Sequence, residues 1–378
     1  MTGPMPVSIA DHFGGLEDPR RAQGTRHQLL DIILIAICAV ICGADGWEDV
    51  QAFGEAKEHW LRSFLELPHG IPSHDTFGRV FARLKPEPFE ACFRSWIAAV
   101  FEQTAGQVVA LDGKTLRRSH DGSRDKAAIH MVSAWATHNA LVLGQVKVDD
   151  KSNEITALPA LLRLLSLEGC IVTIDAMGCQ TDIAQEILAQ DADYVLALKE
   201  NQGTLYQDVL LAFHEARHTG FRGIAHDDCQ TTNRGHGRLE VRRCWTIRDE
   251  EYLDYFSREA HWPGLHSVAM VEAERWVGGR VSHERRYYIS SLPGDAQVLA
   301  RAIRSHWGIE NQLHWVLDIA FREDDCRVRQ GHADENLAVL RHIALSLLKH
   351  ETSSTRGIKG KRLKAAWDTG YLLKALQT

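Results

Sequence analysis

Apolar positions in the first hundred residues recur at the spacing of helices. Residues 32–44 are almost entirely apolar, but this stretch is shorter than the roughly 18 residues that a membrane span requires. It predicts a buried helix that begins near Leu29. A second helix is expected over about residues 47–67, and a third after Ser73, a residue type that often caps helix N-termini. We therefore predict an all-helical N-terminal domain over residues 1–103.

The third of these helices is predicted to have one apolar and one basic polar side. Its polar side would be formed by His74, Thr76, Arg79 and Arg83. A helix, a short turn and a second helix with a basic face fit a helix-turn-helix reader of DNA, which makes Arg79 a candidate DNA contact. Such helix pairs also occur in any all-helical domain, so the pattern leaves both interpretations open.

From residue 108 the apolar pattern changes to short runs typical of strands. The expected order is strand, strand, strand, helix, strand, helix, strand, over residues 108–111, 127–136, 141–148, 154–167, 171–174, 181–190 and 194–198. An antiparallel meander followed by helical crossovers to parallel strands is the order of the ribonuclease-H-like fold. We predict an α/β core with this mixed sheet, its first part over residues 104–217 and its last part over residues 292–345.

Two of the expected strands end at an aspartate, Asp112 and Asp175. In the predicted topology the first and fourth strands are parallel neighbours, so residues at their C-terminal ends converge. A third acid, Glu310, lies in the middle of an amphipathic helix expected over residues 295–321. A lone aspartate after a strand is more often a cap or turn residue. Two aspartates at the ends of strands, with Glu310 further along the chain, favour a functional site.

Three carboxylates in one place predict a divalent metal site. Carboxylate oxygens are hard ligands that suit Mg²⁺ or Mn²⁺, and two such ions about 3.5–4 Å apart can clamp the attacking and leaving oxygens of a phosphodiester. We therefore predict that Asp112, Asp175 and Glu310 are the metal ligands and the catalytic residues, with two bound ions. No organic cofactor and no small-molecule substrate are expected.

Residues 218–291 separate the core strands from the helix of Glu310 and predict a β-rich insertion. Strand-like runs in this segment contain many basic and aromatic side chains. Exposed arginines contact phosphates and exposed aromatic rings stack on bases, which makes Arg238, Trp245 and Trp276 candidate DNA contacts. The alternative is that half of each strand simply faces solvent.

The formal net charge of −7 is unevenly distributed along the chain. Residues 341–378 carry eight Lys and Arg against two Asp and Glu, so an acidic body ends in a basic segment. We predict a basic C-terminal tail over residues 346–378, in which Lys361 and Arg362 contact phosphates. A solvated terminal segment is the alternative.

Targeting and redox signals are weak. The eight cysteines form no CxxC pair, and neither a secretory leader nor an apolar run long enough for a membrane span is apparent. We expect a cytoplasmic protein, associated with DNA and not with a membrane, whose cysteines are reduced.

Several motifs give the chain a resemblance to a known family. They are Ala110-Leu111-Asp112-Gly113-Lys114-Thr115-Leu116-Arg117, Thr173-Ile174-Asp175-Ala176-Met177-Gly178-Cys179-Gln180, His306-Trp307-Gly308-Ile309-Glu310-Asn311 and His314-Trp315-Val316-Leu317-Asp318, together with residues 43–49, 71–77, 198–202 and 234–238. With these motifs the sequence resembles the DDE transposases of bacterial insertion sequences, in particular their H-repeat-associated (Rhs-linked) branch. The resemblance covers nearly the whole chain. It implies that Asp112, Asp175 and Glu310 form the metal-binding triad.

The sequence departs from related transposases near Glu310. These place a Tyr seven residues and an Arg four residues before the catalytic Glu, and a Lys seven residues after it. This chain has Ile303, His306 and Leu317 at those positions. Phosphate positioning must then come from other residues, and the candidates are Lys199, Arg238, Arg304 and His306.

The two histidines around Glu310 are ambiguous. His306 and His314 lie four residues on either side of it and share its helix face. They either steady the carboxylate or contact phosphate, or they are ordinary packed or solvated histidines. The spacing differs from the HExxH pattern of zinc proteases. A phosphate-binding loop ending at Gly113-Lys114-Thr115 is also excluded, because the required glycine is replaced by Val108.

The resemblance implies an enzyme that cuts DNA at the ends of an insertion-sequence element and joins the freed 3′-OH to target DNA. Both steps are metal-dependent in-line phosphoryl transfers. A homodimer or a higher assembly on DNA is expected, because two element ends have to be joined. Two alternatives remain open. One is a catalytically silent, sequence-specific DNA-binding protein of transposase descent, and the other is a metal-dependent DNA nuclease without strand transfer.

Overall fold

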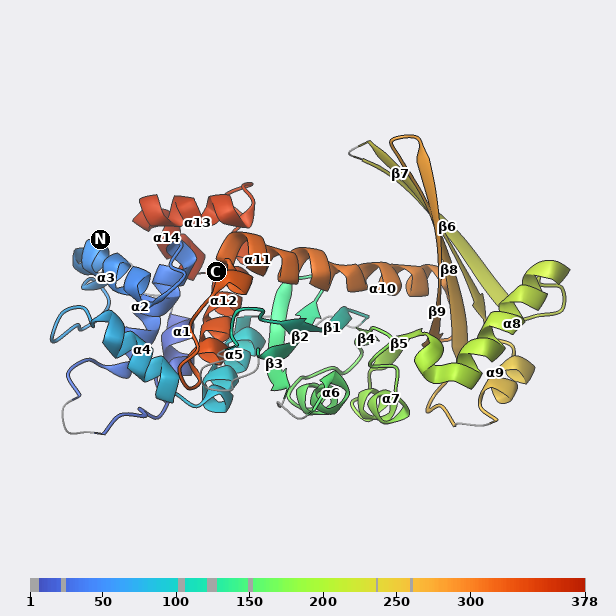
Figure 1. The fold of residues 1–378 in the computed structure, drawn as a ribbon, viewed down its shortest axis with the longest axis horizontal. Coiled ribbons are helices and arrows are strands. Elements are labelled where there is room, and N and C mark those ends of the chain that lie inside the picture. The colour runs from blue at the N-terminus through green and yellow to red at the C-terminus, as the bar shows by residue number, and fades with distance from the viewer. Residues whose placement is uncertain are drawn as a thin grey trace.

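The protein is elongated, with a helical region, a central sheet and a projecting pair of hairpins arranged one after another (Figure 1). This arrangement comes from a computed structural model. The structure describes residues 7–21, 25–100, 106–120, 128–148, 152–235, 237–258 and 261–377. Its central feature is one sheet of nine strands in the order β3-β2-β1-β4-β5-β9-β8-β7-β6.

The described part of the first hundred residues folds into helices, as predicted. They are α1 (Val7–Phe13), α2 (Leu29–Cys42), α3 (Trp47–Leu61), α4 (His74–Arg83) and α5 (Pro86–Val100). The apolar helix α2 is buried along almost its whole length, because the other helices surround it. It ends where Gly43 takes the left-handed conformation at φ 117°, which glycine adopts without steric cost.

The second helix is shorter than predicted. Helix α3 ends at Leu61, and residues 62–67 leave the helix in turns instead of continuing it. Leu67 has a positive φ of 42°, and its N–H donates to Oδ2 of the buried Asp31 at 3.1 Å. This tertiary hydrogen bond, and the proline that follows Leu67, outweigh the helical periodicity of the segment.

The predicted basic tail is instead part of the helical region. Helices α12 (Ala333–His350), α13 (Ile358–Trp367) and α14 (Thr369–Leu376) share one apolar core with α1 to α5. Lys361 is buried, and its Nζ donates to the carbonyl oxygen of Leu348 at 2.8 Å. Arg362 is also buried, and its Nη2 donates to the carbonyl oxygen of Val40 at 2.9 Å. These two charged groups satisfy backbone carbonyls inside the fold, so we no longer regard them as DNA contacts.

The central strands have the predicted ribonuclease-H-like order. Their elements are β1 (Val108–Thr115), β2 (His130–Ala136), β3 (Leu141–Val148), α6 (Glu154–Arg163), β4 (Ile171–Ile174), α7 (Thr181–Leu188) and β5 (Asp193–Leu198). Strands β1, β2 and β3 are antiparallel, and β4 pairs in parallel with both β1 and β5. Several boundaries differ from the prediction, by up to four residues. Strand β1 continues beyond Asp112 because β2 pairs with it as far as Thr115, and α6 ends at Arg163 instead of residue 167.

The β-rich insertion extends the same sheet. It contains β6 (His226–Gly235), β7 (Arg238–Ile247), α9 (Glu250–Phe256), β8 (Ser267–Val277) and β9 (Arg280–Ser290). Strand β9 pairs antiparallel with β5, which joins the two hairpins to the core strands by backbone hydrogen bonds. The short helix η1 (Glu200–Gln202) and helix α8 (Gly203–Thr219) precede the insertion, and α8 was not predicted.

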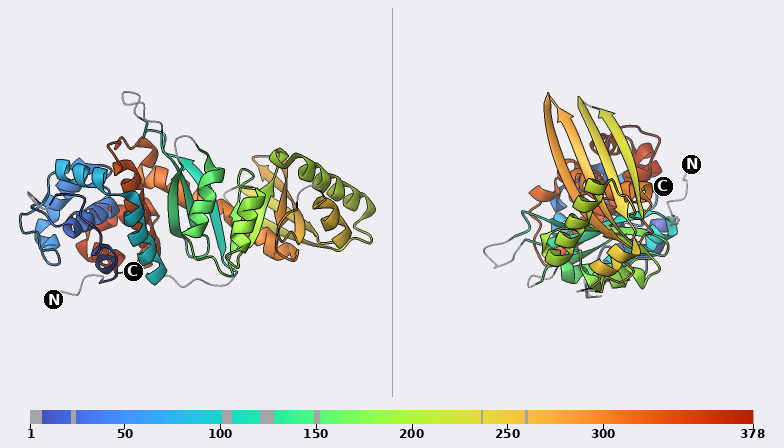
Figure 2. Two further views of the ribbon diagram at one scale, coloured as in Figure 1. Left: turned by 90° about the horizontal axis from the view of Figure 1, so that it is seen from below. Right: turned by 90° about the vertical axis from the view of Figure 1, so that its right-hand side faces the viewer.

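Helices cover the sheet on both faces. Helices α6 and α7 lie on one face and α10 (Ala296–Gly308) crosses the other, as Figures 1 and 2 show from different sides. Separate apolar clusters fill the two layers, one beneath α6, α7 and α8 and one beneath α10. The crossing helix is therefore held against the strands that carry the two aspartates.

The helix of Glu310 is not one continuous α-helix. It begins at Ala296, where the Oδ1 of Asp295 accepts the N–H of Val298 at 2.9 Å. A π-helical segment, η2 (Ile309–His314), then interrupts it before α11 (Trp315–Phe321) and the short η3 (Glu323–Asp325). π-helical turns are rare and are often found at functional sites. Glu310 lies within this turn.

No single helix among the described residues is long and apolar enough to cross a membrane. Helices α2 and α3 reach that length and composition only as a pair, and they are bent by 97° at their junction.

Candidate functional site

The three predicted acids come from three different elements. Asp112 lies in β1 and Asp175 directly follows β4. The residues before them, Leu111 and Ile174, are partners in the parallel ladder, so the two aspartates are neighbours across the strands. Glu310 enters from the π-helical turn above the sheet.

A tight group of ligand atoms forms around Asp112. Oxygen atoms of Asp112 and Glu310 and a ring nitrogen of His314 all lie within 4.8 Å of one another. Asp175 is not a member of this group, and its Oδ1 accepts the N–H of Met177 at 3.0 Å and of Gly178 at 3.4 Å. We call Asp112, Asp175, Glu310 and His314 the acid centre.

Among the described residues, no Lys or Arg forms an ion pair with the carboxylates of the acid centre, and Asp112 has only the imidazole of His314 beside it as a basic group. Burial and, next, the nearby carboxylates of Glu310 and Asp175 together raise the pKa of Asp112 to about 8. His314 Nδ1 lies 3.4 Å from Asp112 Oδ2. Burial, and next the charge of Lys114, lower the pKa of His314 to about 3, so its ring is neutral. Crowded carboxylates with a neutral imidazole are a donor set that fits a hard divalent cation.

His306 faces the other aspartate. Its Nδ1 lies 3.0 Å from Oγ1 of Thr173 in β4. Burial lowers the pKa of His306, while the charge of Asp175 opposes that shift. The two histidines thus flank Glu310 on opposite sides, one towards each aspartate-bearing strand. The structure therefore favours a positioning role over solvent exposure for both rings.

Lys114 connects β1 to the far end of the helix of Glu310. Its Nζ lies 2.5 Å from Asp318, 3.1 Å from Glu323 and 3.2 Å from Asp324. Although burial opposes it, the charge of Glu323 and the contact with Asp318 raise the pKa of Lys114. The lysine holds α11 and η3 against the strand two residues after Asp112. Lys114 belongs to the sequence motif around Asp112, but the sequence did not show that it pairs with Asp318, Glu323 and Asp324.

Gly113 leaves room for a polar pair on the opposite face of β1. A Cβ at this position would lie 2.3 Å from Oε1 of Glu154 and 2.5 Å from Nε2 of His130. These two atoms are 2.6 Å apart, and Nδ1 of His130 is 2.8 Å from Oγ1 of Thr115. A side chain at the position between the aspartate and the lysine would therefore displace this polar pair. Neither His130 nor Glu154 was identified from the sequence.

The predicted DNA contacts are distributed over the surface. Lys199 is exposed directly after β5, and the side chain of Asn201 donates to the carbonyl oxygen of Ala176 at 2.7 Å, so the loop of Lys199 lies against the loop of Asp175. Trp245 is half-buried, and the guanidinium of Arg217 lies over its ring at 5.3 Å. This ring face is already occupied, which argues against Trp245 as a stacking surface for a base.

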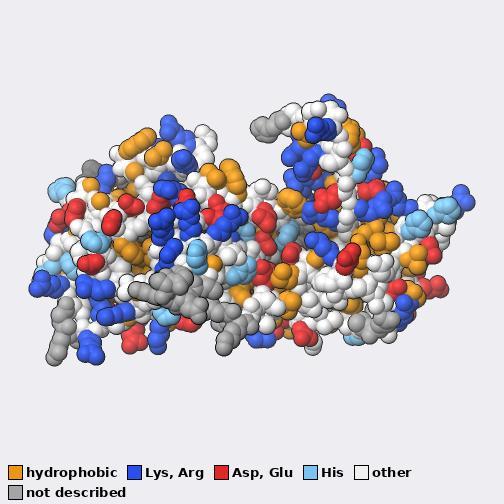
Figure 3. Space-filling model, in the orientation of Figure 1, with side chains coloured by type: hydrophobic (Ala, Val, Ile, Leu, Met, Phe, Trp, Pro, Cys, Tyr) orange, Lys and Arg blue, Asp and Glu red, His pale blue; other side chains and the backbone are white. Residues whose placement is uncertain are grey.

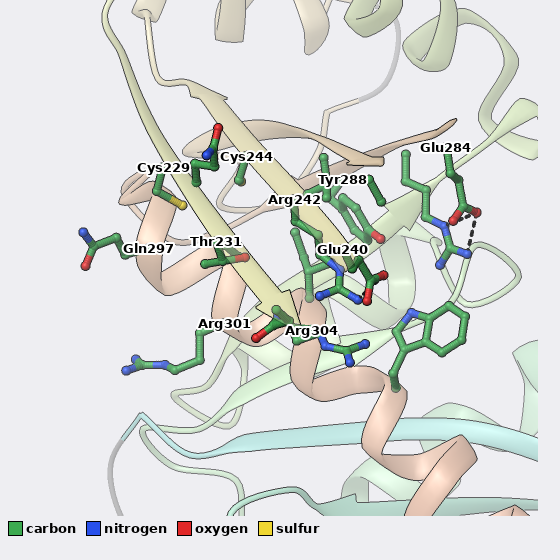
Figure 4. Close-up of a pocket in the computed structure, with 18 of the residues that line it drawn as sticks. Cys229, Thr231, Glu240, Arg242, Cys244, Glu284, Tyr288, Gln297, Arg301 and Arg304 are labelled. Atoms are coloured by element: carbon green, nitrogen blue, oxygen red, sulfur yellow. Dashed lines mark hydrogen bonds and ion pairs between the residues drawn. The ribbon is translucent and has the colours of Figure 1, made fainter. Parts of the chain in front are cut away.

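Arg238 and Arg304 lie near a cleft between the insertion and α10. The cleft has a volume of about 430 Å³, and Arg304 lines it from the helix while the arginines of the strands face it (Figure 4). Its basic lining consists of Arg242, Arg275, Arg286, Arg301 and Arg304. We call this site the arginine cleft. Arg238 lies at its margin, with Nη2 3.9 Å from Oε2 of Glu240.

Arg79 lines a second basic hollow, on the helical region. This N-terminal groove has a volume of about 980 Å³, and its basic lining consists of Arg20, Arg21, Arg26, Arg79, Arg83 and His27. No acidic side chain is among the described residues that line it. Arg20 is held by Asp18 at 2.6 Å, whereas Arg79 and Arg83 form no ion pair with any residue in the described ranges.

Two tryptophans on the helix of Glu310 are exposed. Trp307 is 38% exposed and Trp315 is 60% exposed, and they lie on either side of Glu310, which is itself exposed. Figure 3 shows that the upper outline of the molecule is hollowed between the helical region and the projecting hairpins, with Lys and Arg on both sides. Glu310 thus belongs to a surface with exposed aromatic and basic groups, the combination that binds nucleic-acid strands. The sequence analysis did not identify these tryptophans as exposed.

Comparisons with known proteins agree with this geometry. The family "Transposase DDE domain" matches residues 103–347, and the family "DDE_Tnp_1-associated" matches residues 10–97. The "H repeat-associated putative transposase YhhI" of Escherichia coli (strain K12) is 41% identical over 373 residues, which cover 97% of each chain. An uncharacterized protein encoded in the dhlA 3′ region of Xanthobacter autotrophicus is 47% identical over 287 residues, covering 75% of this chain and 94% of that one.

A shorter relative and a solved structure of low sequence identity also match the chain. The "Inactive transposase YbfQ" of Escherichia coli (strain K12) is 43% identical over 77 residues, which are 20% of this chain and 92% of that one. Among solved structures, a piggyBac transposase synaptic complex with hairpin DNA aligns with a TM-score of 0.41 at 9% identity, over 99% of this chain and 78% of that one. The family match over residues 103–347 and the full-length relative are decisive: the chain belongs to the DDE transposase family.

Proposed function

We propose that this protein is a DNA transposase that cuts at the ends of an insertion-sequence element and joins the freed 3′-OH to target DNA. The observation that carries the proposal is the acid centre, where Asp112 and Glu310 approach one another beside Asp175 and form no ion pair with a Lys or Arg of the described residues. The DDE family uses divalent metal ions. We assign their ligation here to Asp112, Asp175 and Glu310, with Mg²⁺ or Mn²⁺ and two ions as the proposed complement.

The residues of the acid centre would have distinct tasks. Bound divalent cations would polarise phosphate oxygens and lower the pKa of a bound water. Asp112 must lose its proton to become a ligand, so cation binding would release a proton from the site. Asp175 is oriented by the backbone N–H groups of Met177 and Gly178. Glu310 is exposed at the surface, where a phosphodiester would approach.

Neutral histidines suit this arrangement. A ring that is uncharged near neutral pH adds no positive charge that would compete with a cation. His314 lies against Asp112 and His306 against the strand of Asp175, so both restrict the positions of the acids. We assign positioning roles to these two residues.

DNA binding would use the basic surfaces around the acid centre. We propose that the N-terminal groove, with Arg79 and Arg83, binds the duplex at the element end, and that Lys199 contacts phosphate near Asp175. The protein would act on DNA in the cytoplasm, as a homodimer or a higher assembly, because the reaction joins two element ends.

The decisive experiment incubates the purified protein with Mn²⁺ and with the DNA that flanks its coding region. Wild type should yield cut ends and joined products, and Asp112→Asn, Asp175→Asn and Glu310→Gln should yield neither while still binding the DNA. Asp182→Asn, which changes an exposed acid in α7, is the matched control and should retain activity.

The other outcomes discriminate among the alternatives. Metal-dependent cleavage that persists in any of the three acid variants would overturn the assignment of that acid. Cut DNA without joined product would identify a nuclease, and DNA that is bound but intact would identify a silent DNA-binding protein of transposase descent.

A further inference from the structure

The arginine cleft is built by the alternation of side chains along the insertion strands. In β7, Glu240 and Arg242 point to the face that α10 covers, while Arg243 points to the other face. Glu240 is directly opposite Arg275 of β8 in the antiparallel ladder. Side chains two residues apart in a strand share a face, so these charges are brought together by the register of the hairpins.

One buried carboxylate serves several arginines in this cleft. The side chain of Glu240 is only 3% exposed, and its Oε1 lies 2.5 Å from Arg242 and 3.4 Å from Arg275. Arg238 approaches its Oε2 at 3.9 Å. Glu284, the other acid of the lining, is engaged by Arg286 at 2.6 Å. Arg301 and Arg304 form no ion pair with any described residue, so the cleft has an excess of positive charge.

Arg242 has an unsatisfied donor at the floor of the cleft. Its side chain is 16% exposed, and its Nη1 is buried without a hydrogen-bond partner among the described residues. Burial, and next the charge of Arg304, lower the pKa of Arg242. A buried guanidinium N–H without an acceptor is unfavourable, and the neighbouring cations repel one another. An anion bound in the cleft would accept a hydrogen bond from Arg242 and reduce the repulsion between the cations.

We propose that the arginine cleft binds backbone phosphates of the DNA strand on which the acid centre acts. Arg242, Arg275 and Arg304 supply planar donor groups of the kind that bind phosphate oxygens in pairs. Figure 4 shows Arg242 and Glu240 on the strand that faces Arg304 of α10. This inference rests on the proposed function and deepens it, because it names the residues that replace the basic support missing at Ile303, His306 and Leu317.

The position of the cleft relative to the acids fits a shared strand. Arg304 and Glu310 lie on one continuous helical segment, and six residues of helix correspond to about 9 Å along the axis. Phosphates of one strand in a duplex follow one another at about 3.4 Å along the axis. A phosphate in the cleft is therefore within roughly three nucleotides of the one at Glu310.

Salt-dependent DNA binding tests the inference. The full-length protein would be titrated, in EDTA so that no cleavage occurs, with a labelled single-stranded 20-mer and with a 20-base-pair duplex. Arg304→Gln is the principal variant because Arg304 is exposed and forms no ion pair with any described residue. Arg242→Gln is the second variant, with its melting temperature measured to establish that it folds. Arg243→Gln is the matched control, because it lies next to Arg242 but on the opposite face.

The expected result is a loss specific to the cleft. Arg304→Gln and Arg242→Gln should each weaken binding roughly tenfold, as for the loss of a hydrogen bond to a charged group. Each should also reduce the slope of log K against log salt by about 0.7 on the single strand. Arg243→Gln should match wild type. If the variants lose affinity only for the single-stranded probe, the cleft binds a strand that is separated from its complement. If they lose affinity equally for both probes, the cleft binds one strand of a duplex.

Two results would overturn the inference. If Arg304→Gln and Arg242→Gln bind like wild type, the cleft does not hold phosphate. If Arg243→Gln loses as much as they do, the effect is general surface charge. Both differ from failure of the proposed function, in which the wild-type protein itself would bind neither probe or would never cut DNA.

Discussion

The acid centre and the arginine cleft share the helical segment of α10 and η2, through Glu310 and Arg304, and have opposite electrostatic compositions. In the acid centre, carboxylates crowd together with only a neutral imidazole, and the pKa of Asp112 rises. In the cleft, guanidinium groups crowd around Glu240, and the pKa of Arg242 falls. Each region is incomplete by itself. A phosphodiester with divalent cations supplies the cation to the first region and the anion to the second, so the two regions together match one substrate.

The two regions also differ in how they are held. The acids are attached to the centre of the sheet and to a π-helical turn, whereas three of the cleft arginines stand on the projecting hairpins and two, Arg301 and Arg304, on α10. The acid centre therefore has a fixed geometry that suits chemistry. The cleft has longer side chains and fewer constraints, which suits binding. Substitutions should consequently separate turnover from affinity.

The largest expected effect is the loss of turnover in the acid centre. Asp112→Asn should reduce the single-turnover cleavage rate on the order of 10³-fold or more, as expected for loss of a group that acts at the reacting atoms, and leave DNA affinity unchanged. Arg304→Gln should do the reverse, with weaker affinity and a rate at saturating DNA close to wild type. Equal effects of both variants on rate at saturation would show that the two regions are not separable.

The next effect concerns stability at the border of the acid centre. Lys114→Met would leave Asp318, Asp324 and the buried Glu323 without their lysine. Removing one partner of a buried ion pair costs about 3–5 kcal/mol, and Arg341 still lies 3.7 Å from Glu323, so we expect about 3 kcal/mol. Urea unfolding of the variant measures this loss. Lys199→Met, at an exposed site, should change stability by less than about 0.5 kcal/mol.

A further expected effect is the pH dependence that Asp112 imposes. Its folded pKa of about 8 lies above the unfolded value of 3.8. Between these values the folded state binds more protons than the unfolded state, so in EDTA this contribution to stability is present below pH 4 and is lost as pH rises to about 8. Asp112→Asn should remove that dependence, and Arg304→Gln should leave it intact. Melting temperatures across this range would check the difference.

The affinity of the acid centre for a divalent cation should rise with pH, whereas the stability contribution of Asp112 falls. Because the proton on Asp112 competes with the cation, Mn²⁺ affinity should rise with pH and level off above about 8. Isothermal titration with the wild-type protein measures this trend. A constant affinity between pH 6 and 8 would show that Asp112 is not a ligand.

The smallest effect is expected in the N-terminal groove. Arg79→Gln should lower the salt slope for duplex binding by about 0.9 and leave single-strand binding unchanged, since we assign this groove to the duplex. Asp182→Asn serves as a charge change elsewhere on the surface. A larger effect on the single strand would mean that the groove and the cleft bind the same part of the DNA.

The meeting of Asp112 with Asp175 was predictable from the sequence. Two short apolar runs, each followed by an aspartate and connected through a helical crossover, predict two parallel neighbouring strands. Strands β1 and β4 are such neighbours. The helix of Glu310 was predicted from its amphipathic pattern, but the π-helical turn was not, because periodicity over a few residues does not distinguish it from α-helix. Ring positions such as that of His314 depend on this turn.

The arginine cleft was not predictable to the same degree. Which strand face an arginine occupies depends on the register of β6 to β9, and a shift of one residue would reverse it. The basic C-terminal segment illustrates the same difficulty. Its lysine and arginine residues form a charge run in the sequence, yet Lys361 and Arg362 bind backbone carbonyls inside the helical region. A charge count does not show which charges the fold uses.

The ladder between β5 and β9 has a consequence for how such proteins diversify. Val195 to Leu198 pair with Tyr287 to Ser290 through backbone atoms, and backbone pairing is largely indifferent to side-chain identity. The projecting hairpins can therefore exchange their outward residues without disturbing the strand that supports the neighbouring β4. In a lineage of mobile elements, this projecting surface can diversify while the strands that carry the acids are inherited unaltered.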